Sequence, residues 1–180
     1  HLMNELFEKK NLPFYKFGDA IYLAKIETKY WIEYICKRFE NTGKHISPEL
    51  AEEICRLVDN HSSYVQQLSW LLWIRTINTA TTEQLSYALE DLLDQNNILF
   101  QSETENLSAY QMNFLKAIVD GIHTKFSSKE VISKYNLGTS ANIVRLKNAL
   151  LQKELIETNG KEIVLADPVF EVWFKKEMLY

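Results

Sequence analysis

Apolar residues in the first hundred positions recur at intervals of three and four, the spacing of one face of an α-helix. This pattern predicts four helices with short connections, and therefore a small helical bundle over residues 27–97. The most apolar of the four follows Asn60, because Trp70 and Trp73 widen its stripe until nearly every side is nonpolar. A helix of that kind is normally surrounded by other helices.

Capping signals predict where the helices begin. Thr28 is the expected cap of the first helix, and Ser47-Pro48 places an N-cap before a proline at the first helical position. The Ser/Thr-x-x-Gln/Glu spacing of a capping box occurs at Ser63–Gln66, Thr81–Gln84, Ser108–Gln111 and Ser127–Glu130. The central helix therefore begins at a polar turn, where backbone N–H groups can bind an anion. An ordinary capped core helix explains the same residues, and by themselves they favour that interpretation.

The pattern changes after residue 97. Residues 98–107 have mixed polarity and no period, which predicts a linker, with a short strand at Ile98–Phe100 as an option. Beyond it, three helical segments precede two short strands around Asn159-Gly160, a strong hairpin signal. A last helix follows Asp167-Pro168. This order of elements predicts a winged helix-turn-helix domain over residues 108–180.

The predicted fold class is therefore mainly α: a helical bundle, then a winged helix domain whose wing is a small β-hairpin. The third helix of that domain covers residues 140–153, and its inward side is expected to carry Ile143, Leu146 and Leu150. Its outward side is expected to present Ser140, Asn142, Arg145 and Asn148. Because Asn and Arg suit base edges and phosphates, this side is the candidate nucleic-acid surface.

The charge of the chain is uneven along its length. The net charge of the 180 residues is −4, but residues 1–107 hold ten Lys/Arg and sixteen Asp/Glu, whereas residues 108–180 hold ten and eight. An excess of two positive charges is small for a nucleic-acid-binding domain. No apolar run approaches the roughly 18 residues of a membrane span. Cys36 and Cys55 lie in helical patterns and indicate buried thiols in a cytoplasmic protein.

Sequence motifs for catalysis are missing. The chain has neither a phosphate-binding loop of the G-x-x-x-x-G-K-[ST] type nor a G-x-G-x-x-G fingerprint. Its four histidines and two cysteines show no metal-ligand spacing, and no nucleophile–base set can be identified. We therefore expect no catalytic residue and no metal ligand within this chain.

Three stretches resemble a known family. Residues 60–68, with an aromatic-x-Gln-x-Leu pattern after the turn, resemble the sensor-2 region in the helical lid of archaeal-type AAA+/STAND P-loop ATPases, which are also found in bacteria. Family members often have a small Gly-x-Pro-like turn at this point, and the turn in this chain differs because it has neither Gly nor Pro. Residues 135–142 and 167–174 resemble the winged-helix module and closing motif of the same family.

The resemblance implies a function for the chain as part of a larger ATPase. Residues 1–26 would be a remnant of the nucleotide-binding core or a connecting segment, and the core upstream would be the principal partner. That core would bind ATP and Mg²⁺, and the bundle would be its lid. The implied nucleotide-binding residues are those of the turn: Asn60, His61, Ser62 and Tyr64.

Two other functions stay open at this stage. The winged helix can act as a DNA-binding regulator, with duplex DNA as its partner and the bundle as a dimerisation or partner domain. It can also act as a brace that contacts protein, and its mild charge and the aromatic residues of its last helix (Phe170, Trp173 and Phe174) rank this brace slightly above DNA binding.

Overall fold

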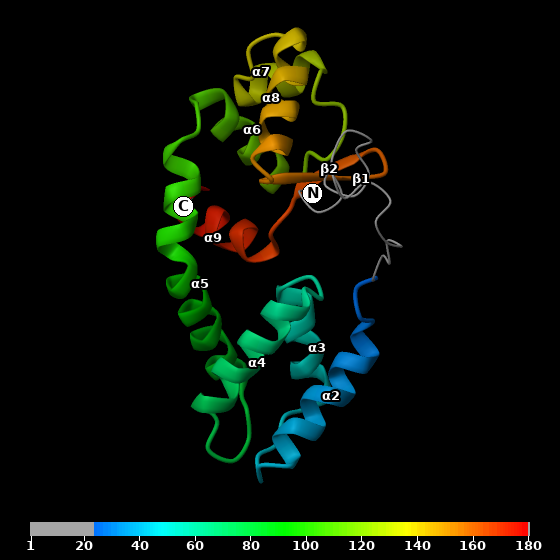
Figure 1. The fold of residues 1–180 in the computed structure, drawn as a ribbon, viewed down its shortest axis with the longest axis vertical. Coiled ribbons are helices and arrows are strands. Elements are labelled where there is room, and N and C mark those ends of the chain that lie inside the picture. The colour runs from blue at the N-terminus through cyan, green and yellow to red at the C-terminus, as the bar shows by residue number, and fades with distance from the viewer. Residues whose placement is uncertain (1–23, 180) are drawn as a thin grey trace, which may run out of the picture.

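The computed structural model describes residues 24–179 of the 180-residue chain. The predicted core remnant, residues 1–26, therefore lies outside the described residues except for its last three positions. The described chain is mainly helical with one antiparallel hairpin, which confirms the predicted fold class (Figure 1).

The first four helices of the described residues match the predicted bundle. They are α2 (Thr28–Glu40), α3 (Pro48–Leu57), α4 (Ser62–Arg75) and α5 (Thr82–Glu105). The two cap signals flanking α4 are confirmed: Ser47 accepts a hydrogen bond from the Leu50 amide, and Thr81 forms a complete capping box with Gln84. The apolar stripes of the four helices meet in one core.

The central helix is only partly enclosed. Val65, Leu68 and Leu72 of α4 are fully buried, but Trp70 and Ile74 are 57% and 51% exposed. The expectation that helices surround α4 on all sides is therefore wrong for this side within residues 24–179. The predicted Ser63–Gln66 capping box is also wrong, because the N-cap of α4 is His61, two residues earlier, and the Gln66 side-chain amide instead donates to the Ser62 carbonyl.

The predicted linker is helical. Residues 98–105 form the last turns of α5, and the optional strand at Ile98–Phe100 does not form. Phe100 and Thr104 are buried one turn apart and continue the inner stripe of α5, whereas Ile98 and Leu99 are 83% and 56% exposed. These exposed apolar residues produced the mixed pattern. Figure 1 shows α5 running along one side of the molecule, from the first helices to the winged helix.

The second half has the predicted order of a winged helix. It consists of α6 (Ala109–Val119), α7 (Lys129–Tyr135), α8 (Ser140–Gln152), β1 (Ile156–Asn159), β2 (Glu162–Leu165) and α9 (Pro168–Leu179). The capping box at Ser108 and the Asn159-Gly160 turn are confirmed. The cap of α7 is Ser128 rather than the predicted Ser127.

Aromatic packing joins α9 to α5. The Phe100 ring centroid lies 5.3 Å from that of Phe170 and 5.6 Å from that of Trp173. The Trp173 indole N–H donates to Asn97 Oδ1 at 2.8 Å. The long helix is therefore shared, since its first half packs in the bundle and its second half packs on the winged helix.

Candidate functional site

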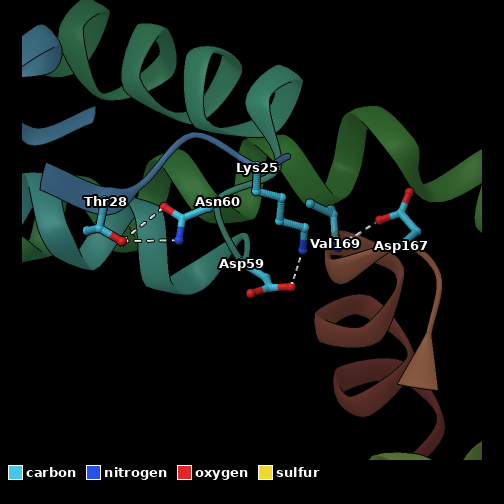
Figure 2. A network of polar contacts seen from close by, with 6 residues as sticks. All are labelled: Lys25, Thr28, Asp59, Asn60, Asp167 and Val169. Atoms are coloured by element: carbon cyan, nitrogen blue, oxygen red, sulfur yellow. Dashed lines mark hydrogen bonds and ion pairs between the residues drawn. The ribbon is translucent and has the colours of Figure 1, made fainter. Parts of the chain in front are cut away.

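The turn before α4 is held in a left-handed conformation at two consecutive residues. Asp59 and Asn60 have φ angles of 47° and 54°, a region that Asn and Asp tolerate better than other non-glycine residues. The Asn60 side-chain amide lies 3.1 Å from Thr28 Oγ1 through its nitrogen. Thr28, predicted to cap α2, is instead its first helical residue. Figure 2 shows this contact and the 2.5 Å ion pair between Lys25 and Asp59 beside it.

The first turn of α4 presents its N–H groups without a side-chain cap among the described residues. His61 is the N-cap residue, its side chain makes no capping bond, and no acidic residue lies in the first turn. His61, Ser62 and Ser63 are exposed. Free N–H groups and the helix dipole make this end electropositive at short range.

Carboxylates line a cavity beside the turn, between α2 and α3. The cavity has a volume of about 370 Å³ and is lined by Thr28, Glu49, Glu52, Glu53, Cys55, Arg56, Asp59 and Asn60. Its guanidinium, Arg56, is bonded to Glu53. A bare phosphate is repelled by such a wall, whereas a base, a ribose or a cation-bound phosphate is not.

Tyr64 faces the winged helix. Its hydroxyl donates to Asp167 Oδ2 at 2.6 Å, and its ring lies 4.7 Å from that of His61. Burial and the bond to Asp167 both raise the pKa of Tyr64 well above its usual range, so the hydroxyl stays protonated and remains a donor. This bond joins residues 103 positions apart in the chain.

Asp167 serves two helices at once. Its Oδ1 accepts a hydrogen bond from the Val169 amide at 2.7 Å (Figure 2) and another from the Phe170 amide at 3.0 Å, which confirms the predicted cap of α9. Its Oδ2 accepts the Tyr64 hydroxyl. Glu103 of α5 lies near it, and burial together with the Asp167 charge raises the pKa of Glu103. The three side chains form the polar joint between the bundle and the winged helix.

The four predicted nucleotide-binding residues therefore lie together but in different situations. Asn60 is engaged by Thr28 and Tyr64 by Asp167, whereas His61 and Ser62 are exposed at the start of α4. The capping role of Asp167 was visible in Asp167-Pro168. Its contact with Tyr64 has no local signal in the sequence, and neither has the position of Glu103.

The candidate nucleic-acid surface is formed by α8. Ile143, Leu146 and Leu150 are buried as predicted, and Ser140, Arg145 and Asn148 are exposed. Asn142 differs from the expectation, because it is half-buried and its amide donates to the Leu137 carbonyl at 3.0 Å. It closes the turn before α8, where Gly138 has a φ of 83° and its backbone approaches both Asn142 and Tyr110.

The described residues contain neither a candidate metal site nor a candidate membrane span. Residues 24–179 contain no group of three or more His, Cys, Asp or Glu side chains arranged to hold a metal ion. None of the helices in this described part is both long and apolar enough to traverse a bilayer.

Comparison with known proteins identifies the second half of the chain. Residues 98–176 match the model of a family described as a probable winged helix domain. The chain therefore contains a winged helix domain, and the match begins within α5.

Among solved structures, the chain is similar to a Walker-type ATPase of Pyrococcus abyssi, with a TM-score of 0.71 and 17% sequence identity. The alignment covers 97% of this chain and 50% of that one, so the chain spans about half the length of the ATPase. At this identity the likeness concerns the fold: the bundle and the winged helix together resemble one half of an ATPase structure. No curated protein matches the chain.

Proposed function

We propose that this chain is the helical lid and winged-helix region of an ATP-binding AAA+/STAND-type ATPase, whose nucleotide chemistry is supplied by a P-loop core. The observation that carries the proposal is the fold agreement over nearly the whole chain with half of a Walker-type ATPase. The missing phosphate-binding loop fits a region that covers a nucleotide rather than one that hydrolyses it.

Within this proposal, the turn at Asn60–Tyr64 approaches the nucleotide. His61 and the uncapped amides of α4 are its accessible groups, while Asn60 and Tyr64 set its shape through Thr28 and Asp167. Since carboxylates line the cavity behind the turn, the adenine and ribose, or a Mg²⁺-bound phosphate, are the parts that fit there. ATP and Mg²⁺ would be held by the core.

The test compares ATP binding and turnover by the chain alone with those of the chain joined to its P-loop core. We expect both activities only in the longer protein, and we expect His61→Ala in it to weaken ATP binding several-fold. His45→Ala is the matched control, because His45 is also exposed but precedes α3, whereas the turn follows the other end of that helix. The proposal fails if the longer protein binds no ATP, and the turn loses its role if the two variants bind equally.

The brace function for the winged helix is favoured by the contacts of α9. Three of its side chains or capping groups reach the first half of the chain: Asp167 to Tyr64, Trp173 to Asn97, and Lys176 to Glu90. A domain so attached is suited to holding the lid in one orientation.

Duplex DNA binding is the second candidate for the winged helix. Residues 140–153 carry Arg145, Lys147 and Lys153 and no acidic residue. Arg145→Ala should then weaken duplex binding and reduce its salt dependence, whereas Arg56→Ala on α3 should not. Absence of duplex binding at low salt would exclude this function.

A further inference from the structure

Among the described residues, 24–179, one edge of the hairpin has no neighbouring strand. In the ladder, Ile156 lies opposite Leu165 and Thr158 opposite Ile163. Leu155 and Ala166 form the next pair along the ladder. The Ala166 amide donates to the Leu155 carbonyl at 3.1 Å, so this pair is a hydrogen-bonded one. Bonded and non-bonded pairs alternate in an antiparallel ladder, and the backbone N–H and C=O groups of Ile156 and Thr158 therefore point away from β2.

The opposite edge of the hairpin supports this assignment. Ile163 belongs to the same non-bonded pair as Thr158, and its amide points outward to the His123 carbonyl at 2.9 Å. The edge on β2 is thus occupied by the segment before α7. On the β1 side, no backbone group within residues 24–179 is bonded to Ile156 or Thr158.

A cleft lies along the open edge. Its volume is about 700 Å³, and it separates β1 and the preceding turn from the second half of α5. Phe100 and Phe170 form its apolar floor, and Leu99, which is 56% exposed, stands on its α5 wall. Consecutive residues of β1 line the other wall, so the backbone edge itself faces this space.

The cleft is acidic. Four carboxylates line it, from Glu103, Glu154, Glu157 and Asp167, against the single ammonium of Lys153. Asp167 is engaged by Tyr64 and the first turn of α9. Glu103 forms no ion pair within the described part of the chain, although it is half-buried.

We propose that the open edge of β1 is a docking site for an extended segment of a partner protein that carries a basic side chain. The outward groups of Ile156 and Thr158 offer two donors and two acceptors to its backbone, which is the mode of β-strand addition. The basic side chain pairs with Glu103 across the cleft, and a neighbouring apolar side chain covers Leu99. Charge complementarity selects this partner, and the site does not depend on ATP binding.

The test uses the full chain and two synthetic peptides, acetyl-Val-Lys-Val-Thr-Val-Lys-amide and its counterpart with Glu in place of Lys. Binding is measured by calorimetry or fluorescence anisotropy. We expect the Lys peptide to bind at least tenfold more tightly than the Glu peptide. Thr158→Pro removes one outward donor without touching a bond to β2 and should weaken binding at least fivefold, whereas Thr158→Val keeps the donor and should not.

A charge pair of variants tests the second contact. Glu103→Gln should weaken binding of the Lys peptide about threefold or more, while Glu105→Gln, two residues further on α5 and outside the cleft, should leave it unchanged. If Thr158→Pro unfolds the wing, amide exchange of the unaltered protein decides the matter. The peptide should then slow exchange at Ile156 and Thr158 more than at Glu157 and Asn159.

Several results would overturn the proposal. They are no binding of either peptide at millimolar concentration, binding that Thr158→Pro and Glu103→Gln both leave unchanged, and a peptide that does not protect the Ile156 and Thr158 amides. Self-association that Thr158→Pro abolishes, with no peptide binding, would assign the edge to a second copy of the chain instead.

Discussion

The bond from Tyr64 to Asp167 makes the strongest prediction about how the two halves are joined. Tyr64→Phe removes only the hydroxyl, so the ring still packs where it does. The donor lies 2.6 Å from a carboxylate oxygen in a half-buried site. Hydrogen bonds to charged groups contribute about 1.5–3 kcal/mol to stability, and partial exposure reduces this, so we expect a loss of about 1–2 kcal/mol.

The assay is urea unfolding monitored by circular dichroism, with the midpoint and slope fitted for each variant. For a protein of this size the loss corresponds to a fall in Tm of about 2–8 °C. Tyr87→Phe is the matched control, because the Tyr87 hydroxyl is exposed and lies 3.4 Å from Glu83 on the same helix. We expect that control to change stability by less than about 0.5 kcal/mol.

The pH dependence of Tyr64 gives an independent check. Its pKa is raised in the folded state, by burial first and by Asp167 second. A raised pKa means that the stabilisation is complete below the unfolded value of about 10 and is lost as the pH rises toward the folded value. The difference between the unaltered protein and Tyr64→Phe should therefore shrink above pH 10. Equal losses of stability in Tyr64→Phe and Tyr87→Phe at pH 7 would show that the bond from Tyr64 to Asp167 does not stabilise the protein.

Three further predictions concern single side chains. Glu103→Gln should raise stability slightly at pH 7 in urea unfolding, because burial and the Asp167 charge raise the pKa of Glu103, and solvent screening keeps the gain small. The gain should vanish below about pH 4, where the carboxyl is protonated in both states. Glu105→Gln, which changes an exposed carboxylate on the same helix, is the control. Asn60→Ala should destabilise the protein by about 1–2 kcal/mol, because alanine is strained at a φ of 54° and the contact with Thr28 is lost. Asn60→Gly also loses the contact but tolerates this φ, so it should destabilise the protein less. Equal losses in the two variants would show that the left-handed backbone does not account for the effect. Cys55 should resist Ellman's reagent at pH 8 until the protein unfolds, because it is fully buried and burial raises its pKa to about 11. Cys36 is half-buried and should react first. Reaction of Cys55 in the native protein would contradict its placement in the core.

Much of the local structure followed from residues close together in the chain. The capping boxes at Thr81 and Ser108, the Asp167 cap and the Asn159-Gly160 hairpin each depend on side chains within a few positions of one another. Such interactions have the same partners in any fold that contains the element, so periodicity and capping signals predicted the helices, the hairpin and their order.

Local signals failed where a segment takes its structure from a distant one. Residues 98–105 look irregular because Phe100 packs on Phe170 of α9 while Ile98 and Leu99 are exposed, and that division appears only once α9 has packed. Asn142 looked like an outward-facing residue by its helical phase, but the turn at Gly138 brings the Leu137 carbonyl to its amide.

The sequence by itself therefore determined the elements, their order and the class of domain, because these depend on side-chain periodicity and short-range hydrogen bonds. Only the tertiary structure decided which polar groups meet. Tyr64 comes from α4, Glu103 from α5 and Asp167 from the cap before α9, and Thr158 faces α5 across a cleft. Contacts over such separations depend on how whole helices pack, which no short stretch of sequence encodes.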